Sequence, residues 1–558
     1  MRKIAAVALL AFASGFIAIL AQREPASAPL VQPASDLLSG PVLMHNQADF
    51  DWPIKPRAAV AQRWFNQGMV LAYGFNHFEA ERAFVQATQI DPDCAMCWWG
   101  AAWSMGPHIN AGMDPANLAI AREHAQRALD VAQPTDFLSI ALSRAMLLRY
   151  AADTTSQVAN HRYAEAMRQV HAKWPDDINV RVLLAEALMN LHPWDYHDAD
   201  GHPRAWTGAI EQLLAQALER HPRHPGANHY WVHLLEASAE PQRAEPAARR
   251  LLRLVPDAGH FAHAAGQLLF RLGDYAAASA AGLSAVETDQ DYIARCRPGR
   301  NLYTESYVPH HYLSLSHAAA MQGRSALALD AATKGAEGFD MERARTPGYE
   351  ALQHYSVMPM LARLRFGRWK ELMALPAPAA DLLYPNAIWH FSRGLASLRL
   401  GQTKLAESEL QALQGIAADA HLASQSVWGV HSFSDFLFIA TSILEAELAA
   451  ERGRIRSAIA HYRRAVERES SLSDDHPPPW YLAPRPMLGA LMLEHDRPGA
   501  AQIVFQNDLR DAPGNPWSLF GLAQSYRAQG LDRQAKAVRA RFESAWEAAD
   551  FELRRAAF

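Results

Sequence analysis

The chain has 558 residues, of which 50% are hydrophobic and 20% are charged, and its formal net charge is −5. That length exceeds what one compact core organises, so we expect several domains or one extended array. The hydrophobic content excludes a disordered chain, and the weakly acidic balance without a long basic run argues against nucleic acid as the main partner.

The N-terminal stretch has the pattern of an export signal. Arg2 and Lys3 precede an apolar run over residues 4–21, and Ala21 and Ala28 offer two ends for it. The run is long for a cleaved signal peptide and short for a membrane span, so an uncleaved anchor is the alternative. We predict a signal peptide or membrane anchor over 1–28 and a linker over 29–50. The body is then periplasmic or secreted, or tethered to the inner membrane through residues 4–21.

From residue 63 the chain carries the pattern of a tetratricopeptide repeat (TPR), a hairpin of two closely packed helices. Gly68 and Ala80 are small enough to let the helices approach, Phe84 packs from the second helix, and proline at 92 ends it. Degraded copies of the pattern recur, with glycine or an aromatic residue at Gly266, Gly273, Gly394, Gly401, Gly453, Gly489, Phe505, Trp517 and Gly521.

These copies predict an all-α, TPR-like α-solenoid of roughly a dozen stacked helical hairpins. No convincing strand pattern is found. We divide the array into N-terminal repeats over 51–190, a central histidine-rich part over 191–365 and C-terminal repeats over 366–558. Irregular insertions interrupt it at 190–204, 296–311 and 470–486, and loops this long are more often functional or capping than filler.

Cys94 and Cys97 form a C-x-x-C pattern at the predicted start of a helix. In an oxidising compartment the two thiols can form a local disulfide, and the alternative is a pair of small buried residues. Covalent haem is not expected, because Trp98 stands where haem attachment requires histidine.

The segment 224–263 carries the strongest chemical pattern in the chain. Its spacing of four and three residues places His229, His233 and Glu236 on one face of a helix. His260 and His263 follow one repeat later, and stacked repeats can bring the two pairs together. Neutral imidazole suits Zn²⁺ and Cu²⁺, and a carboxylate can complete or orient the shell. The alternative is that each histidine only hydrogen-bonds across a helix interface.

Several blocks occur in an order that resembles a known family. They are DPDCAMCWWGAAWSMGPHIN, LHPWDY, HPGANHYWVHLLEAS, PDAGHFAH and PPPWYLAPRPMLGA. They resemble a large family of exported bacterial TPR proteins of largely unassigned function, over most of the mature chain. The resemblance implies the fold and no reaction. The family's N-H-Y-x-x-H-x-x-E-A-S pattern matches residues 228–238, and its G-H-x-x-H pattern matches 259–263. Gln267 replaces a further histidine, and Pro309, His310 and His311 stand at its P-H-N block.

We therefore expect a scaffold that holds a protein, a peptide or a small ligand in its concave groove, with a central pocket for Zn or Cu. A metal-dependent enzyme that uses the same pocket is the alternative hypothesis. The expected metal ligands are His229, His233, Glu236, His260, His263 and His310. The expected ligand contacts are Asn228, Tyr230, Trp231, Tyr303 and His311.

Other polar and aromatic groups have weaker patterns. The first insertion holds a second set of candidate cation ligands, with a solvated loop as the alternative: His192, Asp195, His197, Asp198, Asp200 and His202. Further aromatic residues belong either to the core or to the groove: Trp98, Trp99, Trp103, Trp194 and Tyr196. His77 and His108 are interpreted as turn and capping residues, and the alternative is that they line the groove from the repeat ends.

Overall fold

The computed structural model of the chain describes residues 40–44, 50–472 and 477–557. Within them, 24 α-helices pair consecutively into hairpins, from α1–α2 to α23–α24. The predicted all-α, TPR-like solenoid is confirmed. The predicted signal or anchor segment lies outside the described residues. Among the described helices, each is too short or too polar to cross a bilayer.

The helices follow one another with short connections. The first four hairpins comprise α1 (Ala59–Tyr73), α2 (His77–Ile90), α3 (Ala95–Ser104), α4 (Leu118–Val131), α5 (Phe137–Arg149), α6 (Ser156–Lys173), α7 (Ile178–Met189) and α8 (Thr207–Arg220). The next four comprise α9 (Pro225–Leu235), α10 (Glu245–Leu254), α11 (Gly259–Arg271), α12 (Tyr275–Cys296), α13 (Val308–Met321), α14 (Ser325–Glu337), α15 (Ala351–Arg365) and α16 (Trp369–Ala374). The last four comprise α17 (Leu383–Arg399), α18 (Thr403–Ala417), α19 (Phe433–Glu451), α20 (Ile455–Ser470), α21 (Pro484–Glu494), α22 (Pro498–Asp511), α23 (Pro516–Ala528) and α24 (Asp532–Ala545).

The remaining regular elements are short. Three-residue and four-residue 3₁₀ turns lie at Pro115–Asn117, Pro241–Ala244, Arg343–Arg345 and Ala420–Ala423. A π-helical turn, Tyr303–Tyr307, leads directly into α13. In the described part of the chain, the strands are limited to β1 (Ser426–Val427) and β2 (His431–Ser432), which pair antiparallel. The segment 296–311, predicted as an irregular insertion, is therefore helical from residue 303 onward.

Glycines let consecutive hairpins approach around an aromatic ring. A Cβ on Gly68 of α1 would lie 2.6 Å from the Phe84 ring of α2, and Gly100 of α3 contacts the same ring. At the other end of the chain, Phe505 of α22 lies in the same way between Gly489 and Gly521. A larger residue at these positions would push the helices apart, which explains why the glycine pattern recurs.

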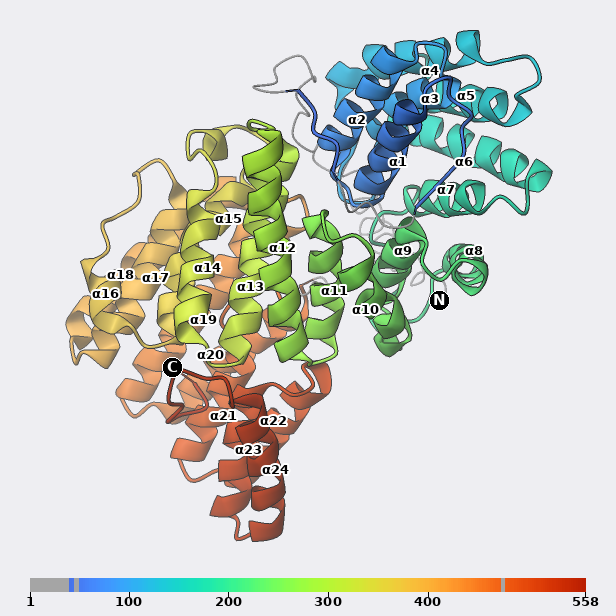
Figure 1. The fold of residues 1–558 in the computed structure, drawn as a ribbon. Helices are drawn as coiled ribbons and strands as arrows, with labels where there is room; N and C mark the ends of the chain where they lie inside the picture. Colours follow the sequence, from blue (N-terminus) through green and yellow to red (C-terminus); the bar gives the residue numbers. More distant parts are fainter. Residues whose placement is uncertain (1–39, 45–49, 473–476, 558) are drawn as a thin grey trace, which may run out of the picture.

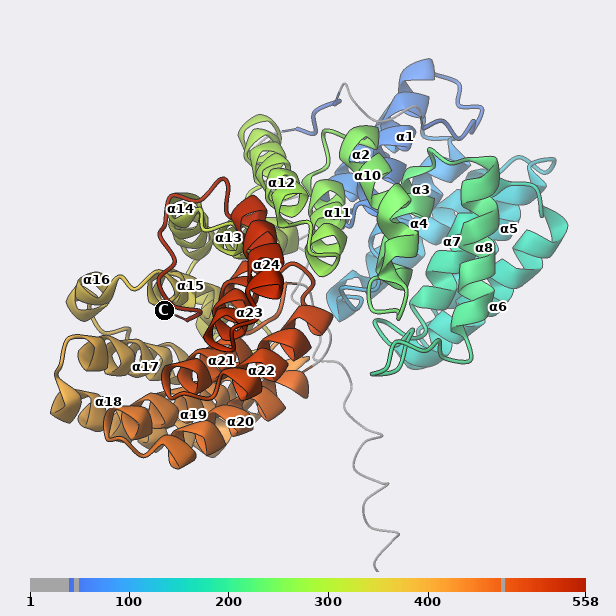
Figure 2. The ribbon, with the colours of Figure 1, turned by 90° about the horizontal axis from the view of Figure 1, so that it is seen from below.

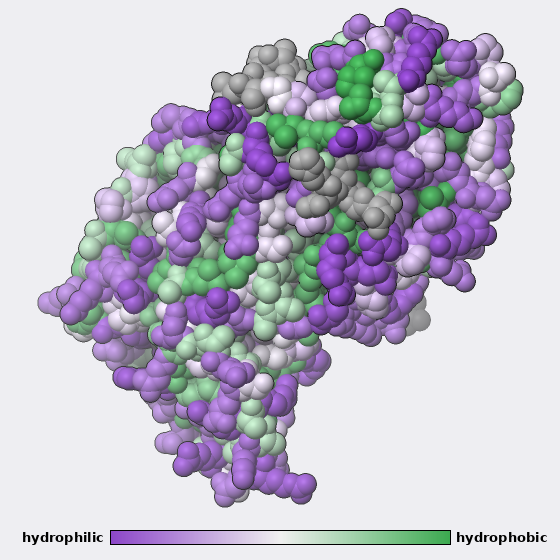
Figure 3. All heavy atoms as spheres, in the orientation of Figure 1, coloured by the Kyte–Doolittle hydropathy of each residue, from purple (hydrophilic) through white to green (hydrophobic). Residues whose placement is uncertain are grey.

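The array has two hydrophobic cores. One takes its residues from positions 44–331 and the other from positions 269–557, so they overlap in the region of α11–α14. Figure 1 shows α1–α8 in the upper right, α12–α24 in the lower left, and α9–α11 between them. In the view from below, α3–α8 lie on the right and α13–α24 on the left (Figure 2). Hydrophilic residues cover most of the face seen in Figure 3.

The curvature of the array brings the first hairpin back against the middle of the chain. α1 packs on α9, and Gly226 of α9 has no room for a side chain because the Tyr73 ring lies over it. On α2, the Arg82 guanidinium donates to the backbone carbonyl of Cys296 at the end of α12. The Tyr292 hydroxyl of α12 donates to Glu79 at 3.2 Å. Helices α1 and α2 therefore pack against α9 and α12, on one side of the region that contains α11.

Candidate metal centre

Five of the predicted histidines meet where α9, α11 and α13 pack side by side. His229 and His233 come from α9, His260 and His263 from α11, and His311 from α13. Each of the five histidines is at most 2% exposed. Helix α9 begins at Pro225, because the His224 ring accepts a hydrogen bond from the Ala227 amide and proline favours the first helical position.

The first group of ligand atoms comes from His229, His233 and His260. One ring nitrogen from each lies within 4.8 Å of the other two. The four-residue spacing on α9 places His229 and His233 one turn apart, and their Nε2 atoms are 2.9 Å from each other. This arrangement agrees with the prediction that stacked repeats bring the two pairs of histidines together.

The outer nitrogens of these two rings are already engaged. His229 Nδ1 lies 2.6 Å from the carbonyl oxygen of Tyr73 at the end of α1, and His233 Nδ1 lies 2.7 Å from Glu236 Oε1. A carbonyl and a carboxylate accept hydrogen bonds, so both Nδ1 atoms carry the proton. In the neutral rings, each Nε2 atom then presents a lone pair, and the two lone pairs face each other.

Burial keeps these imidazoles neutral. Desolvation lowers the pKa of His233 from its usual 6.5 to about 3. The pKa of His229 is lowered well below its usual value by burial and then by His233, and that of His260 by burial and then by His229. A neutral imidazole is the protonation state that binds a metal ion.

A second group is formed by His260, His263 and His311, again with ring nitrogens within 4.8 Å of one another. His311 Nδ1 lies 2.6 Å from Asp289 Oδ2 of α12, so His311 Nε2 faces inward, 3.2 Å from His260 Nδ1. The other oxygen of Asp289 accepts from the Tyr303 hydroxyl at 2.9 Å. His260 thus belongs to both groups.

Three features of the centre were not predicted from the sequence. They are the Asp289 carboxylate, the Tyr73 carbonyl and the Phe75 ring, whose centroid lies 4.6 Å from that of His229 and 5.1 Å from that of His260. Gly259 marks the place where α11 comes close to α12, the helix that carries Asp289. A Cβ at Gly259 would lie 2.8 Å from the Ala285 carbonyl and closer still to the Asp289 carboxylate. Phe75 also has a positive φ of 58°, in the turn that follows α1.

The remaining predicted site residues lie around the centre. Glu236 orients His233, and the half-buried His310 ring lies 4.8 Å from that of His263. Tyr303 orients Asp289, and Tyr230 packs against the Tyr73 ring at 6.0 Å.

Two predicted ligand contacts use their polar atoms within the protein. Asn228 donates to the carbonyls of Pro222 and His224 and accepts from Arg250. The Trp231 indole donates to the Arg243 carbonyl at 3.3 Å. A ligand-binding role for Asn228, Tyr230, Trp231, Tyr303 and His311 stays a prediction.

The predicted turn and aromatic residues lie beside the centre or in the core. His77 begins α2, where its Nδ1 lies 2.8 Å from the Ser104 carbonyl, and the His108 ring stacks on Phe75 at 4.7 Å. Trp99, Trp103 and Tyr196 are buried, and Trp98 is half-buried. Trp194 is 45% exposed, and its ring meets that of His233 edge-on at 5.2 Å.

The insertion 190–204 holds the second predicted set of cation ligands only in part. Asp198, Asp200 and His202 converge at the surface, whereas the His192 ring stacks on Trp206 and Asp195 pairs with Arg204. The insertion packs on the end of α9, where the Ala239 amide donates to the Gly201 carbonyl. It therefore covers the side of the centre next to His233.

Cys94 and Cys97 form a disulfide at the start of α3, with their Cα atoms 5.3 Å apart. Of the two interpretations of the C-x-x-C pattern, the structure has the local disulfide.

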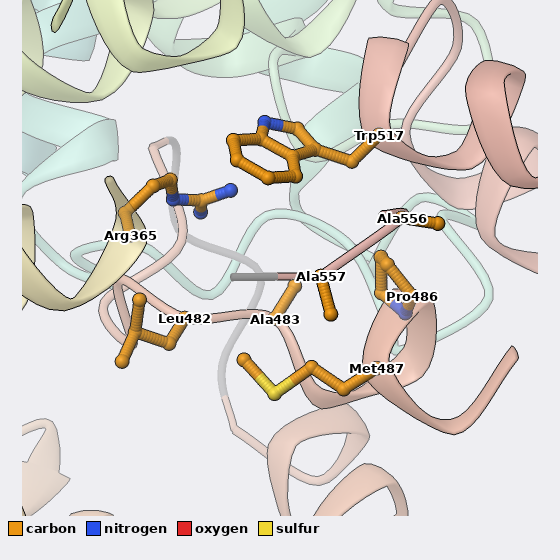
Figure 4. A pocket seen from close by; sticks show the side chains of 8 residues that line it. All are labelled: Arg365, Leu482, Ala483, Pro486, Met487, Trp517, Ala556 and Ala557. Atoms are coloured by element: carbon orange, nitrogen blue, oxygen red, sulfur yellow. The ribbon is translucent and has the colours of Figure 1, made fainter. Parts of the chain in front are cut away.

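A separate pocket lies near the C-terminus (Figure 4). The Arg365 guanidinium points toward the Trp517 indole there, and the carbon between its nitrogens lies 5.3 Å from that ring. The pocket is lined by Arg365, Leu482, Ala483, Pro486, Met487, Trp517, Ala556 and Ala557. None of the site residues predicted from the sequence is among them, so this pocket is distinct from the histidine centre.

No family model matches the chain, and no curated protein matches it in sequence. Among solved structures, it is similar to the human IFIT1 dimer with m7Gppp-AAAA, with 12% identity, a TM-score of 0.30, and coverage of 88% of this chain and 91% of that chain. It is also similar to the APC/C hetero-tetramer Cut9-Hcn1, with 12% identity, a TM-score of 0.27 and coverage of 88% of each chain. Scores this low carry no argument about function, and the classification of the fold rests on the helical hairpins described above.

Proposed function

We propose that this helical-repeat protein binds a transition-metal dication, Zn²⁺ or Cu²⁺, at the histidine centre between α9 and α11. One observation carries the proposal: the Nε2 atoms of His229 and His233 are 2.9 Å apart while both Nδ1 atoms are committed to acceptors. Two facing lone pairs repel each other. A proton between them would place a charge in a fully buried site, whereas a dication is bound by both nitrogens.

The surroundings support a metal ion in preference to a purely structural cluster. Histidines that bind a metal generally donate their other N–H to a carbonyl or a carboxylate, which fixes the tautomer and the ring orientation. Tyr73, Glu236 and Asp289 supply such acceptors to His229, His233 and His311. An all-imidazole set favours Zn²⁺ or Cu²⁺, because Ca²⁺ and Mg²⁺ prefer oxygen ligands.

Elemental analysis of the purified protein tests the proposal. The wild type, equilibrated with Zn²⁺ or Cu²⁺ and then desalted, is expected to retain at least one metal ion per chain. The double variant His229→Gln/His233→Gln is expected to retain one ion fewer per chain than the wild type, because both facing nitrogens are gone. His354→Gln is the matched control, since His354 is 1% exposed, hydrogen-bonds to the Tyr384 hydroxyl and belongs to neither histidine group. Equal and negligible metal in the wild type and the double variant would remove the proposal.

The ligand set also keeps the enzyme hypothesis open as a second candidate. Three imidazoles leave one position of a tetrahedral ion for water or a substrate, as in catalytic zinc sites. In Co²⁺-loaded protein, a change in the visible spectrum on adding azide would identify such an exchangeable position. An unchanged spectrum at saturating azide would argue for a closed site.

We propose further that the body of the protein works outside the cytoplasm, as the apolar run over residues 4–21 indicates. The Cys94–Cys97 disulfide supports this, because disulfides persist in oxidising compartments. A protein or small-molecule partner for the scaffold stays a proposal. Cell fractionation of the full-length chain tests the location, and recovery in the cytosol would contradict it.

A further inference from the structure

The two histidine groups share one residue. His229, His233 and His260 form the first group, and His260, His263 and His311 form the second. The ring centroid of His260 lies 5.1 Å from that of His229 and 5.5 Å from that of His311. His260 therefore stands between two sets of inward-facing nitrogens, on the middle helix of the three.

Both ring nitrogens of His260 are placed for ligation. Nδ1 lies 3.2 Å from His311 Nε2, whose own Nδ1 donates to Asp289. Nε2 is fully buried and has no hydrogen-bond partner. A buried polar atom without a partner costs free energy, roughly 1–3 kcal/mol, unless a ligand compensates for it.

We propose that the centre holds two metal dications joined by His260, with Nε2 bound to the first ion beside His229 and His233, and Nδ1 bound to the second beside His263 and His311. This inference rests on the proposed function, because it extends the same site from one ion to two. The second position is the new element.

The protons and charges of the step balance. Neutral His260 carries one N–H; when the second ion binds, this proton leaves to solvent and a metal–nitrogen bond replaces it, so the ring becomes an imidazolate that bridges the ions. Each position has one carboxylate directly behind a ligand, Glu236 behind His233 and Asp289 behind His311. These two carboxylates and the imidazolate offset most of the charge of the two dications.

The stoichiometry of metal binding separates the inference from the proposed function. The wild type is expected to bind two ions per chain, and His311→Gln and His229→Gln are each expected to bind one. His260→Gln is expected to bind fewer than one, because both positions lose a ligand. His354→Gln, the buried control, is expected to bind two. A wild type that binds one ion, unchanged in His311→Gln, overturns the second position and leaves the proposed function standing, whereas no binding at all overturns both.

The bridge has its own readout in the wild-type protein, which does not depend on any variant folding. An imidazolate between two Cu²⁺ ions couples their spins, so the electron paramagnetic resonance signal of protein with two coppers is expected to fall well below that of two isolated ions. His311→Gln with one copper is expected to give the full signal of one ion. A wild-type signal equal to the sum of two isolated coppers overturns the bridge.

Discussion

Asp289 determines which nitrogen of His311 faces the centre, although nothing in its local sequence marks it. Its carboxylate accepts from His311 Nδ1 at 2.6 Å and from the Tyr303 hydroxyl at 2.9 Å, and it is 1% exposed. An acceptor of this kind fixes the tautomer and raises the basicity of the ligating nitrogen. In the proposed metal centre, Asp289 would therefore position His311 and would not itself be a ligand.

Replacing Asp289 with asparagine is expected to weaken metal binding at the second position about 10-fold to 100-fold. The amide keeps the shape of the side chain but loses the charge that strengthens the hydrogen bond to His311. Titration calorimetry with Zn²⁺ measures the effect. Asp291→Asn, on the same helix and paired with Arg295 at the surface, is the control and is expected to change nothing. Equal affinity in the two variants would contradict the positioning role.

The buried carboxyl of Glu81 in α2 is expected to make the stability of the protein depend on pH. It is 4% exposed, and burial raises the pKa of its carboxyl from 4.5 to about 7. The folded state therefore holds the proton over a range where the unfolded state has lost it. Its contribution to stability is present below pH 4.5 and is lost as the pH rises to about 7, where the buried carboxyl must ionise.

Glu81→Gln removes this titration. The free energy of unfolding of the variant, relative to wild type, is expected to rise between pH 5 and pH 8 by a few kcal/mol, about 3 at most, since one pKa unit corresponds to about 1.4 kcal/mol. Denaturant unfolding at the two pH values measures the difference. A difference between variant and wild type that stays the same at both pH values would show that Glu81 ionises normally in the folded protein.

At the scale of the element, the packing unit is an aromatic ring between two glycines of successive hairpins. Phe84 lies between Gly68 and Gly100, and Phe505 lies between Gly489 and Gly521. Turns between paired helices use glycine for a different reason: Gly401 and Gly453 have φ of 74° and 69°, which other residues rarely adopt. One residue type thus sets both helix spacing and chain reversal.

Gly68→Ala is expected to destabilise the protein by about 1–3 kcal/mol, because the added Cβ would lie 2.6 Å from the buried Phe84 ring. Gly415→Ala is the matched control. Gly415 also lies inside a helix, α18, but has nothing within 4 Å of an added Cβ, so alanine is expected to stabilise by up to about 1 kcal/mol through its higher helix propensity. Chemical denaturation of both variants measures the effects. Stabilisation by both would show that α1 and α2 have room to adjust.

At the scale of the whole molecule, the centre lies where distant hairpins meet. α9, α11 and α13 supply the imidazoles, and the end of α1 supplies the Tyr73 carbonyl and the Phe75 ring. A metal ion bound there would tie together four hairpins that span more than 200 residues of chain. In the proposed metal-bound state, binding and folding would therefore be coupled across the N-terminal core.

Metal is expected to raise the thermal unfolding midpoint, and a chelator is expected to reverse the rise. At free metal about 100 times the Kd, the stabilisation is about 2.7 kcal/mol for one site. Calorimetric or circular-dichroism melts measure the shift. His229→Gln/His233→Gln is expected to show a smaller rise than the wild type, because the first metal position is lost. A shift of the same size in that variant would assign the stabilisation to another part of the chain.

Much of the fold could be predicted because its signals are local. Helical periodicity, small residues at Gly68 and Gly489, and the spacing of His229, His233 and Glu236 all act within a few turns of helix, where geometry is fixed by the backbone alone. The sequence also placed His260 and His263 one repeat away, since neighbouring repeats must stack.

The tertiary structure decided the rest. Whether α1 returns to α9 depends on the small rotations between successive hairpins added over eight helices, and no window of sequence contains that sum. The packing of α1 on α9 brings the Tyr73 carbonyl and the Phe75 ring to the histidine centre. The close approach of Gly259 to α12 brings Asp289 there. The amino-acid sequence determined which imidazoles share a helix face; the curvature of the array determined what holds them, and that His260 stands between the two groups.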